Sequence, residues 1–170
     1  STSDIIHQYS LSTAFDLSTA SYDSVSFSVA SQTTGAGGIF FKPDGTKMYI
    51  IGNTTDSVYQ YSLSTAWDLS TASYDSVSFS AASQDTNVVD IFFKPDGTKM
   101  YVLGGGAAYQ YSLSTAWDLS TASYDSVSSN LRSQDLNNRG IFFKPDGTKM
   151  YATGLSDFVY QYSLSTAWDL

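Results

Sequence analysis

Few residues in this chain could carry out acid–base, nucleophilic or metal chemistry. Its 170 residues include sixteen aspartates, one histidine (His7), no cysteine and no glutamate. Later copies of the segment around His7 carry tyrosine in its place, at Tyr59, Tyr109 and Tyr160. Catalysis would need a base held beside a reacting group, and no Ser-His-Asp set recurs along the chain. We therefore interpret His7 as incidental, and the sequence predicts no enzyme activity.

Metal, cofactor, nucleic-acid and membrane binding are not expected either. A calcium site would need several oxygen ligands within one short loop, such as D-x-D-x-D, and none is present. The absence of cysteine excludes disulfides and thiolate metal sites. A net charge of −8 is opposite to the basic stripe that nucleic acid requires, and no apolar run approaches the length of a membrane span. The aspartates recur in short polar motifs, which indicates turn and loop-capping roles.

Three segments repeat along the chain and define its organisation. The eleven residues IFFKPDGTKMY occupy 39–49, 91–101 and 141–151. The segment QYSLSTA(F/W)DL begins at Gln8, Gln60, Gln110 and Gln161, and the segment STASYDSVS begins at Ser18, Ser70 and Ser120. The chain is thus three units of about fifty residues, with one additional copy of the QYSL segment near its start.

The sequence of each unit predicts four short strands and no helix. Residues 38–42 form an apolar run that ends in a Pro-Asp-Gly turn, and 47–52 form the return strand. Residues 57–63 alternate, and residues 22–29 alternate more regularly, with serine on one face, as suits an outermost strand. The turn glycines, Gly45, Gly97 and Gly147, are expected at positive φ. Four antiparallel strands in a fifty-residue tandem repeat are typical of β-propeller blades.

The repeated segment also resembles known families. FFKPDGTKMYVLG, followed by YQYSL, is similar to the F-x-P-D-G blades of the YVTN and TolB-like propellers. The near-identical units further resemble tandem-repeat propeller proteins of aquatic bacteria and their phages. These resemblances imply an all-β fold of four-stranded antiparallel blades and imply little about activity.

Three blades cannot close around an axis, so we expect closure by association of several chains. Residues 1–37 would supply a third and a fourth strand, 38–80 blade 1, and 81–131 blade 2. Residues 132–170 would form three strands of a last blade, completed by a fourth strand from another chain. The bulky pair Phe40 and Phe41 on the innermost strand favours a nine-bladed trimer over a six-bladed dimer. One copy of the third strand is surplus in either ring.

Differences between the units fall in two sets of connections. One set precedes each innermost strand (33–38, 85–90 and 135–140), and the other joins the second strand to the third (53–57, 105–107 and 155–158). Both sets emerge on the same face of an up-and-down blade. Short polar side chains on a rigid scaffold suit recognition, so we predict a binding face for a glycan or another cell-surface ligand. The candidate residues are Thr33, Thr34, Asn53, Thr55, Asp56, Asp85, Asn87, Asp90, Asn137, Asn138, Arg139, Ser156, Asp157 and Phe158.

Two other interpretations stay open. The chain could be a purely structural assembly module, such as a virion or appendage component, or a designed symmetric propeller. It could also be a lectin that stacks sugars on Trp67, Trp117 and Trp168, although we favour these residues as packing plugs against a neighbouring blade. The six lysines flank the Pro-Asp-Gly turns, where we interpret them as solubilising charges.

Overall fold

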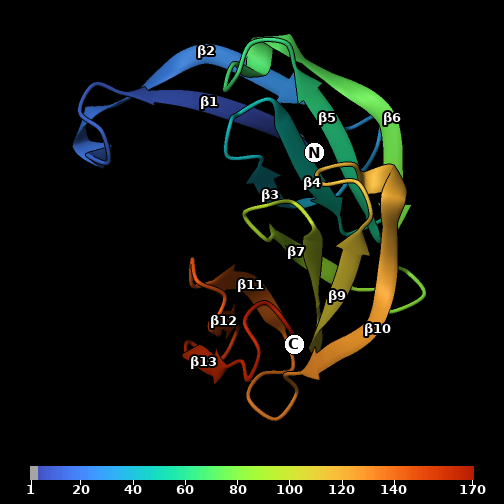
Figure 1. Cartoon of the computed structure of the whole chain (residues 1–170). Coiled ribbons are helices and arrows are strands. Elements are labelled where there is room, and N and C mark those ends of the chain that lie inside the picture. Colours follow the sequence, from blue (N-terminus) through green and yellow to red (C-terminus); the bar gives the residue numbers. More distant parts are fainter. Residues whose placement is uncertain (1–3) are drawn as a thin grey trace.

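The sheets of the chain follow one another along an arc. The structure is a computed structural model, and it describes residues 4–170. It contains one two-stranded, one three-stranded and two four-stranded sheets (Figure 1). Strands β3, β7 and β11 lie toward the inside of the arc, and β2, β6 and β10 lie on its outside. The predicted all-β class of antiparallel, propeller-like sheets is confirmed.

Two sheets are complete blades. Blade 1 consists of β3 (Ala36–Phe41), β4 (Lys47–Gly52), β5 (Ser57–Leu63) and β6 (Ala72–Ser80) in that order. Blade 2 consists of β7 (Val88–Phe93), β8 (Lys99–Gly104), β9 (Ala107–Leu113) and β10 (Ala122–Asn130). All neighbouring strands within them are antiparallel.

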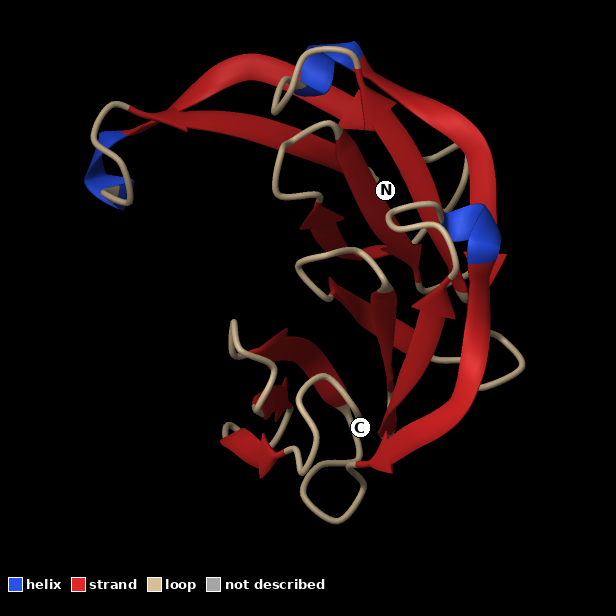
Figure 2. Cartoon of the chain, in the orientation of Figure 1, coloured by secondary structure: helices blue, strands red, loops and turns tan. Residues whose placement is uncertain are grey.

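The two remaining sheets are incomplete blades at opposite ends of the arc. The hairpin of β1 (Ile5–Leu11) and β2 (Ala20–Ser28) has only the third and fourth strands of a blade. Blade 3 has β11 (Asn138–Phe143), β12 (Lys149–Gly154) and β13 (Val159–Ser163), and lacks a fourth strand. Figure 2 shows the hairpin extending past blade 1, away from the other sheets.

Each outermost strand contains a β-bulge that the sequence pattern did not predict. In blade 1 the pairing of β5 with β6 shifts between Gln60 and Tyr61, and Ser76 has φ 58°. The shift leaves Asp75 and Ser76 unpaired, and Asp75 accepts hydrogen bonds from Gln60 Nε2 (2.8 Å) and Ser62 Oγ (2.9 Å) on the neighbouring strand.

The turn glycines have the predicted conformation. Gly45, Gly97 and Gly147 have φ of 75°, 75° and 72°, which confirms the expectation for the Pro-Asp-Gly turns. One-turn 3-10 helices in the repeated loop before each outermost strand were not expected (Leu17–Thr19, Leu69–Thr71 and Leu119–Thr121). An aspartate caps each of them, as Asp118 accepts the backbone N–H of Ser120 at 3.0 Å.

The cores lie between blades rather than inside a single sheet. Tyr49 and Ile51 of blade 1 pack in one buried cluster with Ile91 and Phe93 of blade 2. A second cluster joins Tyr101 of blade 2 to blade 3. A blade without a neighbour therefore leaves apolar side chains in water. Within residues 4–170, no helix has both the length and the apolar character needed to cross a bilayer.

Candidate functional site

The variable connections lie together on one face of the arc, as the strand order requires. They bond to each other within each blade: Asn53 N–H donates to the Gly35 carbonyl (2.7 Å) in blade 1, and Leu155 N–H donates to the Asn137 carbonyl (3.2 Å) in blade 3. We call these connections the variable face. The repeated turns and the Trp-containing loops lie at the opposite strand ends and form the copied face.

Several residues predicted to contact a ligand hold the loops together instead of facing solvent. Thr33 and Asn138 are buried. Thr33 Oγ1 accepts the backbone N–H of Gly35 at 3.2 Å, and Asn138 Nδ2 donates to the Gly105 carbonyl at 3.3 Å. Asp85 accepts the Asn87 N–H at 2.9 Å and the Tyr109 hydroxyl at 3.3 Å. The sequence pattern could not separate these loop-closing residues from free ones, because both are short and polar.

Asp90 joins two blades. Its carboxylate accepts the N–H of Ile91 in its own blade and the N–H of Ile141 in blade 3, both at 2.9 Å. Burial raises the pKa of Asp90 above its usual value, although these two backbone N–H groups act in the opposite direction. The geometry gives Asp90 a role in packing blade 3 against blade 2.

The exposed candidates are fewer. They are Thr34, Thr55, Asn87, Asn137, Arg139, Asp157 and Phe158, while Asn53, Asp56 and Ser156 are half-buried. The side-chain oxygens Asn53 Oδ1 and Asp56 Oδ1 are buried without a hydrogen-bond partner in the described chain. The variable face therefore offers amide, hydroxyl, guanidinium and aromatic groups from all three blades.

On the copied face, the tryptophans act as plugs between blades. The Trp117 ring lies over Gly97 of its own blade and stacks on Phe93 (5.6 Å). It also stacks on Phe40 of the preceding blade (6.3 Å), and its carbonyl accepts the Tyr49 hydroxyl at 2.6 Å. Trp168 repeats this arrangement between blades 2 and 3. Both rings are 9% exposed, which leaves no open face for sugar stacking.

Two lysines have a role that the sequence interpretation missed. Lys47 and Lys99 lie 3.1 Å from the bulge carboxylates of Asp75 and Asp125, so the interpretation of all six lysines as solubilising charges was wrong for these two. Burial opposes ionisation of Asp125, yet hydrogen bonds from Gln110, Ser112 and Lys99 hold its pKa below the usual value. The fixed spacing of lysine and aspartate in each unit was the available signal.

The same network is divided between the two ends of the arc. Lys149 in blade 3 donates to Ser163 Oγ (3.3 Å) and forms no ion pair within residues 4–170. Asp23 on the hairpin accepts Gln8 Nε2 and Ser10 Oγ, both at 2.9 Å, and has no lysine partner there. Each end thus carries one half of an ion pair that blades 1 and 2 complete.

The aromatic plug is divided in the same way. Trp67 packs against Phe41 of its own blade (ring centroids 5.4 Å apart, tilted) but is 54% exposed, because the preceding hairpin has no first and second strand to cover it. At the far end of the arc, Phe142 is 56% exposed, whereas its equivalents Phe40 and Phe92 pack between blades.

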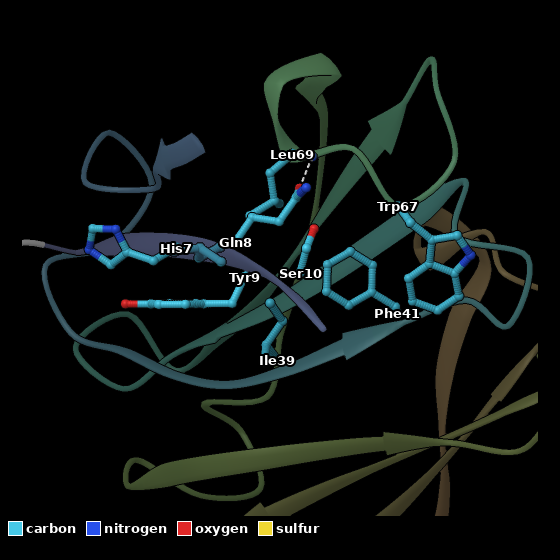
Figure 3. Close-up of a pocket in the computed structure, with 9 residues that line it drawn as sticks. His7, Gln8, Tyr9, Ser10, Ile39, Phe41, Trp67 and Leu69 are labelled. Carbon is cyan, nitrogen blue, oxygen red and sulfur yellow. Dashed lines mark hydrogen bonds between the residues drawn. The ribbon is translucent and has the colours of Figure 1, made fainter. Parts of the chain in front are cut away.

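A groove marks the place where a first and a second strand are missing. It has a volume of about 550 Å³ and lies between the hairpin and blade 1 (Figure 3). Ile39, Phe41 and Trp67 form one wall, and residues of β1 form the other. The hairpin is held there by Gln8 Oε1, which accepts the Leu69 N–H at 2.9 Å. Gln60 and Gln110 make the same bond to Leu119 and Leu170 of the following blades.

Comparisons with known proteins identify the fold. No protein-family model and no curated protein matches the sequence. The chain superposes over 98% of its length on 46% of a provisionally named 6-phosphogluconolactonase from Bacteroides fragilis, with a TM-score of 0.66 and 15% identity. A provisionally named 6-phosphogluconolactonase from Bacteroides uniformis gives a TM-score of 0.64 and 12% identity, over 95% of this chain and 48% of that one.

A third similar structure, a functionally unknown protein from Desulfotomaculum acetoxidans, gives a TM-score of 0.62 and 14% identity over 95% of this chain and 48% of that one. The chain therefore has a β-propeller-like fold, and it spans less than half the length of these relatives. Sequence identity of 12–15% supports a shared fold and no statement about activity.

Proposed function

We propose that this chain is a non-enzymatic scaffold that closes a propeller ring with copies of itself and presents its variable face for recognition. One observation carries the proposal: Trp67 is 54% exposed, whereas Trp117 and Trp168, in the same turn and sequence context, are 9% exposed. The difference is the absence of a preceding first and second strand beside Trp67. Closure by oligomerisation, expected from the repeat number, would supply these strands.

The unmatched groups at the two ends of the arc are equivalents of groups that contact each other inside it. Blade 3 of a second copy, placed beside blade 1, would bring Phe142 onto Trp67 and Lys149 to Asp23. The Tyr151 hydroxyl would reach the Trp67 carbonyl, as the Tyr49 hydroxyl reaches that of Trp117. A head-to-tail contact of this kind gives a ring where its rotation closes and an open filament where it does not, and only a ring leaves no unmatched end. Two copies would give six blades and three would give nine.

The recognition role rests on the variable face. Its exposed groups come from three non-equivalent loop sets, whereas the copied face is repeated and its tryptophans are plugs. Arg139 is exposed and offers five donors in a fixed fork, which suits a polar anchor. The net charge of −8 disfavours an anionic partner, so a neutral glycan fits best. The resemblance to YVTN and TolB-like blades is compatible with such a scaffold but does not specify its ligand.

A purely structural role is the second candidate, and a specific observation favours it. Thr33, Asp85, Asp135 and Asn138 bond within their own loops, so much of the sequence difference between units serves loop closure. In that case the ring itself would be the product, with no ligand on either face.

Two measurements separate these functions. The native mass of the assembly should correspond to two or three copies of the 170-residue chain. A monomer at micromolar concentration would overturn ring closure. A glycan array would then be probed with the native ring and with a variant in which the exposed residues Asn87, Asn137 and Arg139 are replaced by alanine, while the buried loop residues and Asp90 stay in place. Binding lost on substitution supports the variable face. Equal binding places the site elsewhere, and no binding by either ring favours the structural role.

A further inference from the structure

The chain carries two strands for one position in the joint. β1 and β13 share the sequence QYS, and each occupies the third place of an incomplete blade, β1 beside β2 and β13 beside β12. If blade 3 of one copy enters the groove beside blade 1 of the next, only one strand can lie between β12 and β2. This inference rests on the proposed ring closure and asks which strand remains.

β13 is fixed by contacts on both sides. The Tyr162 hydroxyl donates to Gln134 (3.3 Å), as Tyr61 and Tyr111 do to Gln32 and Gln84. The segment after β13 carries Trp168, which is buried between blades 2 and 3 and whose carbonyl accepts the Tyr101 hydroxyl at 2.7 Å. Leu170 N–H donates to Gln110 Oε1 at 3.0 Å. Removing β13 would break the contact between two blades.

Strand β1 and the segment after it make fewer side-chain contacts that depend on their position. The segment after it carries Phe15 and Leu17, which are 99% and 82% exposed, whereas the equivalent Trp117 and Leu119 of blade 2 are buried. The side-chain hydrogen bonds of β1 are few: Gln8 accepts the Leu69 N–H, and Gln8 and Ser10 both donate to Asp23. Gln161 and Ser163 are the same residue types at the same places in β13, and could replace them.

We propose that β13 of one copy displaces β1 of the next and pairs with its β2. The register of β5 with β6, where Gln60 faces Val77, Tyr61 faces Tyr74 and Ser62 faces Ser73, gives the geometry. Gln161 would then face Val25, Tyr162 would face Tyr22, and Ser163 would face Ser21. Tyr160 would replace His7 beside Tyr22, restoring the tyrosine pair seen as Tyr59 with Tyr74 (6.1 Å). Strand β1 would leave the sheet.

Paired cysteines test this directly, because the natural chain has none. S21C/S163C should link chains to each other on oxidation, giving covalent multimers on a non-reducing gel. S10C/S21C joins residues that pair within one chain when β1 stays on β2, and should form little disulfide in the ring. S62C/S73C, internal to blade 1, has the same register and is the control for oxidation without chain linkage.

A deletion provides the second measurement. Removing residues 1–17 should leave the number of chains in the ring unchanged, because β2 would still pair with β13 of another copy. If β1 stays in the joint, Ser10 would face Lys149 of the other copy, as Ser62 faces Lys47, and S10C/K149C would link the chains. That linkage, or dissociation of the ring by the deletion, would show that β1 is the strand in use and would overturn this inference alone. A monomeric wild-type chain would overturn ring closure as well.

Discussion

Replacing Trp67 and Trp117 by alanine compares two side chains that differ in one feature of their surroundings. Both have positive φ (66° and 65°), lie over a turn glycine and pack against a phenylalanine of their own blade. Only Trp117 also packs against a preceding blade. The backbone strain at positive φ cancels in the comparison, so the difference between the variants isolates the contact between blades.

The exposed fractions of the two tryptophans give the size of the expected difference in the free energy of unfolding. Trp67 is 54% exposed and Trp117 is 9% exposed, a difference of 45% of the residue surface. For an indole of about 250 Å², this is roughly 110 Å², or about 3 kcal/mol at about 25 cal/mol per Å². In the unassembled chain, W117A should therefore lower the free energy of unfolding by about 3 kcal/mol more than W67A. In the ring, the missing contact forms, and W67A should weaken each joint about a hundredfold.

Dilution experiments that follow native mass would measure the joint, and urea unfolding below the dissociation concentration would measure the unassembled chain. W117A provides the control, since its contact lies within one chain and should change the unfolding free energy more than the joint affinity. Equal unfolding costs for both variants in the unassembled chain would refute the packing argument. Unchanged association of W67A would refute the placement of Trp67 at the joint.

Two further outcomes follow from the repeated contacts. In the unassembled chain, G97A should lower the free energy of unfolding by about 1 kcal/mol from positive φ, plus the cost of displacing the buried Trp117. G45A should cost less there because Trp67 can move into solvent, and equal melting shifts below the dissociation concentration would contradict this. D125N should lower the free energy of unfolding at pH 7 by about 1–3 kcal/mol. The folded-state pKa of Asp125 lies below its unfolded value, so this stabilisation is present above about pH 4 and is lost as the pH falls through the folded-state pKa. Urea unfolding at pH 7 and pH 3 should show the gap between wild type and D125N narrowing, and a constant gap would contradict the assignment.

The strands and their turns could be predicted because each depends on neighbouring residues. The return strand and the third strand were predicted at 47–52 and 57–63, and β4 and β5 have these bounds. A Pro-Asp-Gly turn sets its own φ values, and alternation selects the faces of a strand. The bulge at Ser76 was missed because it is stabilised from the adjacent strand, by Gln60 and Ser62 bonding to Asp75.

The site was less predictable, because burial of a loop residue depends on the loop opposite. Thr33 and Thr34 are adjacent and identical, yet Thr33 is buried against Thr54 (Oγ1 to Oγ1, 3.1 Å) and Thr34 is exposed. No local pattern distinguishes them. The loops on the variable face close on each other in pairs, so each pair must be known before its exposed members can be identified.

Near-identical units make the defects of the arc informative. Several groups that have a partner inside the arc lack one at its ends, although their sequence context is the same. Lys149 without an aspartate, Asp23 without a lysine and Trp67 without a preceding blade are three examples within residues 4–170. All three lie at the open ends, and each has its counterpart at the opposite end. In the proposed joint between copies, Lys149 would pair with Asp23 and Phe142 would cover Trp67, so each unmatched group at one end would meet the group that it lacks.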